Sequence, residues 1–120
     1  NFSVSSAHES NKWYHVAVVR QAASKTLQIF EDGNLLGDGL LTSSAPFYIT
    51  GAVLLGQEQD AVGGGFSSGQ ALEGQLDEVR IWNTARSPAE IGDNFQKTLG
   101  ATEKRLFVTL RGANLTEVSK

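Results

Sequence analysis

The sequence predicts an all-β domain of antiparallel strands with one short helix near its C-terminal end. Thirteen glycines and only two prolines punctuate the 120 residues. Between them lie short runs rich in valine, isoleucine, leucine and aromatic residues, a texture typical of strands joined by tight turns. A chain of this length can bury one core. We therefore expect residues 1–120 to form a single domain, with the polar residues 111–120 as a frayed tail.

The first two strands and their connection are the clearest part of the pattern. Residues 13–20 (WYHVAVVR) place Tyr14, Val16 and Val18 on one face and Trp13, His15, Ala17 and Val19 on the other. Because both faces are apolar, we expect this strand to be central. A polar turn at 21–25 leads to a second strand at 26–30. The dipeptide Asp32-Gly33 then supplies the positive backbone dihedrals of a tight hairpin.

Further strands follow with less regular spacing. The return strand of the hairpin is expected at 35–41, and short strands at 47–50 and 52–55. Strand character resumes at 72–82, with Leu76, Val79 and Ile81 as expected core residues. The step from Leu76 to Val79 breaks the alternation, which predicts a bulge near Asp77 and Glu78. A last strand is expected at 105–110.

One helix is predicted at about residues 88–99. Ser87 is a helix cap, Pro88 suits the first helical position, and Glu90 completes a capping box three residues after the cap. Ile91, Phe95 and Leu99 follow at helical spacing, and these three form a single apolar stripe that would lie on the sheet. Gly100 stands where a left-handed stop is expected.

Composition excludes several classes of function. The formal charge is only −3 and the basic residues form no run, so we expect neither a nucleic acid nor a membrane as partner. The longest apolar stretch is too short to cross a bilayer, so no membrane insertion is expected. With no cysteine, disulfides and thiolate metal sites are excluded, and two histidines are too few for a histidine metal site.

Enzymatic activity is also disfavoured. Asp77 and Glu78 form a carboxylate pair of the kind that glycosidases use, but the E-x-D-x-x-E strand pattern of sandwich glycosidases is absent. An ion pair with Arg80 is the preferred interpretation. His15 is interpreted as a packed or rim residue. Both tryptophans, Trp13 and Trp82, are interpreted as packing residues, with a sugar-stacking platform as the alternative.

The glycine-rich loop at 56–69 is the one segment whose residues suggest a binding site. A loop of this length without periodicity is usually functional or disordered. Glu58, the Gln59 carbonyl, Asp60 and the Gln70 amide offer the oxygen ligands that calcium takes. Glycines 63–65 allow the loop to turn back so that Gln70 approaches the acids. A solvated polar loop with two surface acids explains the same residues equally well.

The order of these motifs resembles the laminin G-like and pentraxin family. LLGQEQDAVGGGFSSGQAL is similar to the pentraxin calcium loop, and GQLDEVRIWNTARSPAEI to the segment that closes these domains. WYHVAVVR and the EDG hairpin resemble the preceding strands, so the likeness runs from about Trp13 to Leu99. It implies an antiparallel two-sheet jelly-roll sandwich, and by position it implies calcium ligation by Glu58, Gln59, Asp60 and Gln70.

Two departures from the family pattern bear on affinity and completeness. Pentraxins have a further glutamate where this chain has Ser67, and an Asp-Asn pair from a strand that would precede Asn1. Fewer charged ligands weaken calcium binding. The family's first strands are also missing, so the sandwich is expected to be incomplete at its N-terminus. Since this leaves a sheet edge and an apolar face unpaired, we expect self-association or a larger parent chain.

The resemblance implies a function in recognition rather than catalysis. We expect an extracellular or cell-surface module that is not an enzyme and binds carbohydrate or another polar ligand, with calcium as the candidate cofactor. The alternative is a structural or assembly module that uses the same sandwich for protein contacts without calcium. Fold-level likeness does not identify the ligand.

Overall fold

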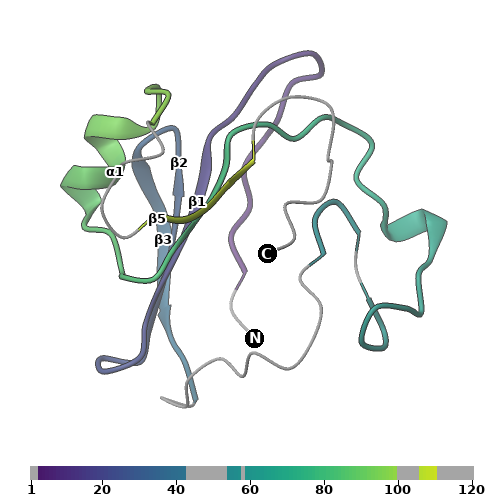
Figure 1. The fold of residues 1–120 in the computed structure, drawn as a ribbon, viewed down its shortest axis with the longest axis horizontal. Helices are drawn as coiled ribbons and strands as arrows, with labels where there is room; N and C mark the ends of the chain where they lie inside the picture. The colour runs from purple at the N-terminus through teal and green to yellow at the C-terminus, as the bar shows by residue number, and fades with distance from the viewer. Residues whose placement is uncertain (1–2, 43–53, 58, 100–105, 111–120) are drawn as a thin grey trace. The chain divides into compact units, whose positions relative to one another are not determined.

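The computed structural model describes residues 3–42, 54–57 and 59–99, and the backbone of 106–110. In chain order the elements are β1 (Val16–Gln21), β2 (Thr26–Glu31), β3 (Asn34–Leu40), the 3-10 turn η1 (Ser68–Gln70), β4 (Val79–Trp82), α1 (Pro88–Asn94) and β5 (Leu106–Leu110) (Figure 1). Strands and one short helix therefore make up the regular structure, in agreement with the predicted class. The expected strand at 47–50, most of that at 52–55, and the 111–120 tail lie outside the described residues.

The chain divides into two compact units. The first consists of Asn1–Pro46 with Trp82–Phe107, and the second of Phe47–Ile81 with Val108–Lys120. The first unit contains a three-stranded sheet in the order β1-β2-β3. A pair formed by β4 and β5 is the second sheet.

The hairpin between β2 and β3 follows the sequence prediction. Asp32 and Gly33 form its two-residue turn with φ angles of 46° and 80°, and Glu31 pairs with Asn34 directly across it. Glycine accepts such a dihedral without steric cost, and aspartate is one of the few other residues that tolerate it. The turn is also tied to β1, because the Asp32 carboxylate accepts a hydrogen bond of 2.9 Å from the His15 main-chain N–H.

The sheet has one covered face and one exposed face. Cross-strand pairing of Ala17 with Phe30 places both on the covered face, where Phe30 is only 1% exposed. On the other face Val16 and Val18 remain 58% and 62% exposed. The prediction that the first strand is central is wrong for the described sheet, because β2 is central and β1 lies at the edge.

The core of the first unit lies where α1 covers the sheet. Ile91 packs with Val19 and Phe30, and Ala17 borders the cluster. Burying an aliphatic or aromatic side chain in this way stabilises the fold by about 1.5–3 kcal/mol per residue. Leu99 is also buried, so two members of the predicted stripe are core residues.

The N-terminus of α1 has the predicted cap, but the helix is shorter than expected. Ser87 Oγ accepts from the Glu90 N–H at 3.2 Å, and the Glu90 carboxylate accepts from the Ser87 N–H at 2.8 Å, with Pro88 at the helix start. The helix ends at Asn94 rather than residue 99. Its last three residues, Gly92 to Asn94, are weak helix formers. The Asn94 side chain donates to the Glu90 carbonyl at 2.7 Å.

The segment expected as one strand at 72–82 forms a strand only from Val79 onward. Glu78 has a φ of 50°, and its N–H donates to the Asp77 carboxylate at 2.7 Å. The predicted irregularity is therefore present, but it delays the strand instead of bulging it. Leu76 and Ile81, predicted as core residues, are exposed. The predicted ion pair is confirmed, since Arg80 Nη2 lies 3.1 Å from Glu78 Oε2.

The two tryptophans have different surroundings. Trp82 packs as predicted, with the Arg86 guanidinium 4.2 Å from its ring centre. Trp13 is 61% exposed, so its interpretation as a packing residue is wrong in this structure. His15 is half-buried and its ring centre lies 5.9 Å from that of Phe95, in agreement with a packed or rim position. Among the described residues no helix has the length and apolarity that crossing a bilayer requires.

Candidate functional site

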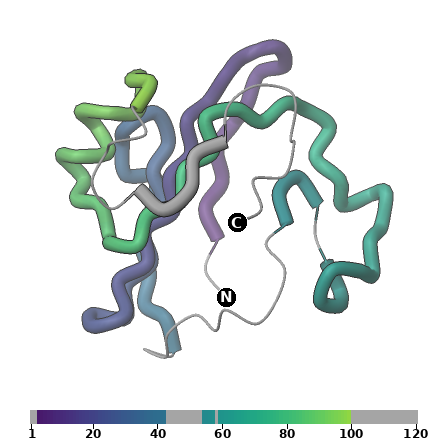
Figure 2. The backbone as a smooth tube through the Cα atoms, viewed as in Figure 1, coloured from purple at the N-terminus to yellow at the C-terminus, as the bar shows by residue number. Residues whose placement is uncertain are grey.

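The loop that follows Gly56 is closed at its base. Gln57 pairs with Ala71 in an antiparallel bridge, and the Leu72 N–H donates to the Gly56 carbonyl at 2.7 Å. In Figure 2 the described residues of this loop are drawn in teal. Glu58 lies outside the described residues, but its neighbour Gln57 pairs with the residue directly after Gln70. The bridge thereby joins the two described residues that flank the predicted set, Gln57 and Ala71.

Gln59 and Asp60 lead into a tight turn in the outgoing limb. Ala61 and Gly64 exchange two main-chain hydrogen bonds of 2.9 and 3.2 Å. The Gly63 N–H also donates to Gln59 Oε1 at 2.8 Å. The side chain of Gln59 is therefore engaged within the loop. The calcium ligand expected from Gln59 is its main-chain carbonyl oxygen, which is not the atom that accepts this hydrogen bond.

Gly65 brings the loop back against Asp60. Its φ is 74°, and a Cβ at this position would lie 2.7 Å from the Asp60 Cβ and 3.1 Å from the Asp60 nitrogen. Only glycine meets both conditions. Asp60 itself is exposed. The Asp60 side chain is thus accessible to solvent, while Gly65 packs against its backbone and Cβ.

The returning limb carries Gln70 at the end of η1. The Gln70 N–H donates to the Ser67 carbonyl at 3.0 Å. The same carbonyl accepts from Gln57 Nε2 at 2.9 Å. Gln57 therefore joins the base of the loop to the turn that carries Gln70. Sequence reasoning missed this role, because nothing in the residue pattern distinguishes Gln57 from the neighbouring glutamines.

The chemistry of the predicted set suits calcium. Two carboxylates, an amide and a main-chain carbonyl are all oxygen donors, and calcium accepts such mixed sets at 2.3–2.6 Å in a flexible shell. Gly65 lies so close to Asp60 that the returning backbone packs directly against this acid. Within the residues that the structure describes, no group of three or more His, Cys, Asp or Glu side chains gathers at one point. The predicted ligand set contains only two such side chains, Glu58 and Asp60, and takes its other oxygens from Gln59 and Gln70.

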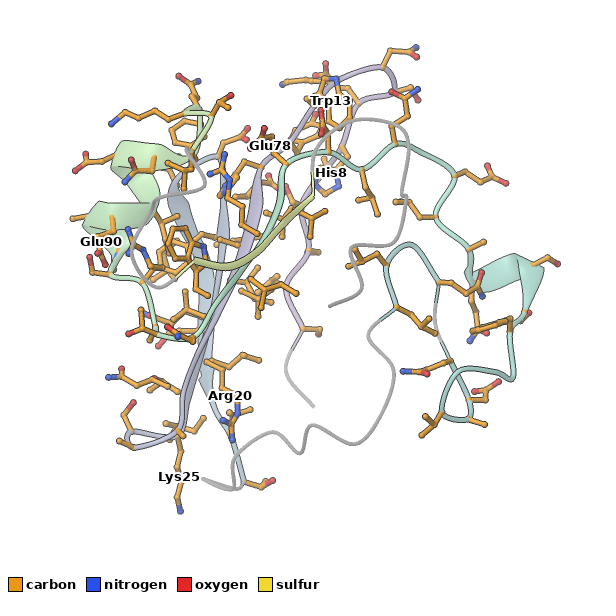
Figure 3. All side chains as sticks on the ribbon, viewed as in Figure 1. His8, Trp13, Arg20, Lys25, Glu78 and Glu90 are labelled. Carbon is orange, nitrogen blue, oxygen red and sulfur yellow. The ribbon has the colours of Figure 1, made fainter. Side chains whose placement is uncertain are left out.

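A second polar cluster lies in the first unit, at the end of β2. The two Glu31 carboxylate oxygens have separate partners, Ser6 Oγ at 2.7 Å and His8 Nε2 at 2.6 Å. These hydrogen bonds, Ser6 first, hold the pKa of the Glu31 carboxyl below its ordinary value. His8 also packs edge-on against the ring of Tyr14. The position of His8 is labelled in Figure 3.

This Glu31 cluster does not have the geometry of a catalytic triad, although it contains serine, histidine and glutamate. A triad requires the nucleophile to bond to the histidine. Here both Ser6 and His8 bind the carboxylate. The arrangement fastens the N-terminal segment to the sheet. Sequence reasoning missed it, because Ser6 and His8 are 25 and 23 residues away from Glu31.

Comparisons with known proteins agree with the fold. Residues 1–92 match the laminin G family model described as the concanavalin A-like lectin/glucanases superfamily. Neuronal pentraxin-2 of Cavia porcellus is 37% identical over 83 residues, which is 68% of this chain and 19% of that protein. Neuronal pentraxin-1 of Rattus norvegicus is 36% identical over 81 residues, 67% of this chain and 19% of the relative.

A solved structure is also similar. Residues 221–444 of an S-layer domain-containing protein from Clostridium thermocellum match with a TM-score of 0.59 and 25% identity, over 77% of this chain and 43% of that one. The chain spans about a fifth of the length of the curated relatives it matches. On the strength of the family match over residues 1–92, this chain belongs to the concanavalin A-like lectin/glucanase superfamily, with laminin G-like and pentraxin relatives.

Proposed function

We propose that the chain is a recognition module of an extracellular or cell-surface protein, which binds carbohydrate or another polar ligand with the help of calcium. The ligands of the ion are the carboxylates of Glu58 and Asp60, the Gln59 carbonyl and the Gln70 side chain. The observation that supports this most is the closure of the loop at Gln57 and Ala71. It joins the limb that contains the acids to the limb that contains Gln70.

A bound calcium ion supplies open coordination positions that hydroxyl, carboxylate or phosphate oxygens of a ligand can fill. The protein's part is to hold its own oxygens on one side and leave the other side to solvent. Asp60 is exposed, and so are nearly all described residues from Ala61 to Gln70. An ion at this loop would therefore be accessible to a ligand from outside.

The module is proposed to bind and not to catalyse. The superfamily description includes both lectins and glucanases, so the distinction has to come from the residues. Glu78, the candidate acid closest to a strand, is paired with Arg80 at 3.1 Å. A carboxylate held by a cation is a poor general acid, because the cation favours its ionised form. The glycosidase strand pattern is also absent from the sequence.

Calorimetric titration with calcium tests the proposal. The wild-type chain should bind calcium, and Asp60→Ala should abolish the heat signal. Asp38→Ala is the matched control, because Asp38 is exposed on β3 of the first unit and should leave binding unchanged. A wild-type protein that gives no signal at millimolar calcium contradicts the proposal. A glycan-binding assay with and without a chelator then tests the ligand class.

The second candidate function is assembly without calcium. It is favoured by the exposed face of the sheet, where Val16 and Val18 are exposed and Val18 pairs with the half-buried Ile29 of β2. Contiguous exposed apolar surface marks a contact site. We infer that this sheet is one half of a two-sheet jelly roll, whose other half comes from a second copy of the chain or from a larger parent chain. A chain that self-associates but gives no calorimetric signal with calcium would favour this function.

A further inference from the structure

We propose that Gln57 is a positioning residue of the loop: its side chain holds the returning limb, and with it Gln70, to the base of the loop. This role rests on the proposed calcium site, but Gln57 itself is not among the ion's ligands. The loop offers two limbs that must approach each other, and little apolar packing to hold them. Of the described residues from Gln59 to Gln70, none is buried. Hydrogen bonds therefore have to maintain the shape.

The contacts of Gln57 join three parts of the loop. Its backbone pairs with Ala71 at the base. Its side-chain Nε2 donates to the Ser67 carbonyl at 2.9 Å, ten residues along the chain. Ser67 directly precedes η1, the turn that ends in Gln70. One half-buried side chain thus links the base of the loop to the start of the turn that carries the amide ligand.

The Ser67 carbonyl is the shared acceptor in this link. It receives Gln57 Nε2 at 2.9 Å and the Gln70 N–H at 3.0 Å. A carbonyl oxygen has two lone pairs, so these two donors use its capacity. If the amide of residue 57 is lost, the carbonyl keeps only the local bond to Gln70. The turn is then held to the base only through Ala71, so the hydrogen bond of the Gln70 N–H should open to solvent more often.

The outgoing limb has its own, independent fastening. Gln59 Oε1 accepts from the Gly63 N–H at 2.8 Å, and Gly65 packs against Asp60. Neither contact involves Gln57. Loss of the Gln57 amide should therefore loosen the returning limb and leave the tight turn of the outgoing limb as it is. This difference distinguishes a positioning role from general destabilisation of the loop.

The test uses Gln57→Leu and Gln57→Glu, both of which keep the size of the side chain and remove the donor. In calcium-free protein, amide hydrogen exchange measured by NMR should be several-fold faster at Gln70 and unchanged at Gly63. In calorimetry, Gln57→Leu should bind calcium about three- to tenfold more weakly, the range expected for one lost hydrogen bond. Gln75→Leu is the matched control, because Gln75 is exposed beyond the loop, and should change neither quantity.

The outcomes separate the two proposals. Wild-type protein without calcium binding overturns the calcium site, while the exchange rates still decide whether Gln57 holds the limb. Unchanged exchange at Gln70 in either variant overturns the positioning role. Faster exchange with unchanged calcium affinity also overturns it, and leaves the calcium site standing. Faster exchange at Gly63 together with Gln70 would show general loosening of the loop and count against the inference.

Discussion

Gly33 and Phe95 are in such close contact that a Cβ on residue 33 would lie 2.9 Å from Phe95 Cδ1. The contact joins the β2–β3 turn to the segment that follows α1. Gly33 also has a φ of 80°. Conformation and space therefore both require glycine at this position.

Gly33→Ala should lower the free energy of unfolding by at least about 2 kcal/mol, because a left-handed dihedral and an overpacked contact each cost about 1–3 kcal/mol. Chemical denaturation measures the change. Gly74→Ala is the control, since Gly74 lies outside the left-handed region and a Cβ there would make ordinary contacts of 3.6–3.9 Å with Leu72. Equal effects of the two substitutions would contradict the packing of α1 against the turn.

The capping box of α1 gives a second prediction. Ser87→Ala removes the acceptor for the Glu90 N–H and should cost about 1 kcal/mol of stability. Circular dichroism and denaturation curves should show the loss together. Ser10→Ala makes the same chemical change at an exposed position outside the helix and should have little effect. A cap that contributes nothing would give identical curves for both variants.

The Glu31 cluster predicts a specific sensitivity to acid. The pKa of Glu31 is lowered in the folded state by the hydrogen bonds from Ser6 and then His8. A carboxyl with a lowered folded pKa contributes stability that is complete above its unfolded pKa of about 4.3 and is lost as the pH falls through the folded value. Glu31→Gln should therefore reduce the difference in stability between pH 7 and pH 3.

Denaturation at the two pH values measures this difference. Ser6→Ala removes the first cause of the shift and should reduce the acid-dependent loss in part, whereas Ser5→Ala, one residue away and exposed, should not. If Glu31→Gln and wild type lose the same stability on acidification, the hydrogen bonds to Glu31 do not fasten the N-terminal segment in solution.

Ser67 predicts a gain of function. It stands where the resemblance to pentraxins implies a further glutamate, so Ser67→Glu adds a carboxylate to the returning limb. Calcium affinity should rise at least tenfold, because affinity depends strongly on the number of charged ligands. Ser68→Glu adds the same charge at the neighbouring position and is the control for a general electrostatic effect. Equal gains in calorimetry would show that the charge acts from a distance and not as a ligand.

The exposed face of the sheet predicts association. Val18→Lys places a charge at the centre of this face and should shift the protein towards monomer in light scattering. Val62→Lys is the control, since Val62 is even more exposed, at 78%, but lies in the loop. A wild-type protein that is a folded monomer at micromolar concentration would contradict the prediction.

Local sequence signals predicted the elements whose chemistry is local. Asp32-Gly33 and the Ser87–Glu90 box were found because turn and cap geometry depend on a few adjacent residues. The length of α1 was overestimated because the stripe through Phe95 and Leu99 is set by tertiary packing, while Gly92 and its neighbours end the helix.

Contacts between distant residues could not be predicted in the same way. The order of strands in the sheet and the exposure of Trp13 depend on which surfaces meet, and a single sequence does not contain that information in its local pattern. For the candidate site, the sequence predicted a binding loop and a set of oxygen donors, and that ligand set stays a prediction. The sequence did not reveal that Gln57 contacts Ser67, since ten residues of irregular chain separate the two.

The bridge between Gln57 and Ala71 also bears on how such a module can diversify. A segment whose two ends are hydrogen-bonded to each other can change its interior without altering the register of the strands on either side. Insertions or substitutions inside the segment would then alter ligand preference with little penalty to folding. New specificities could arise there while the scaffold stays constant.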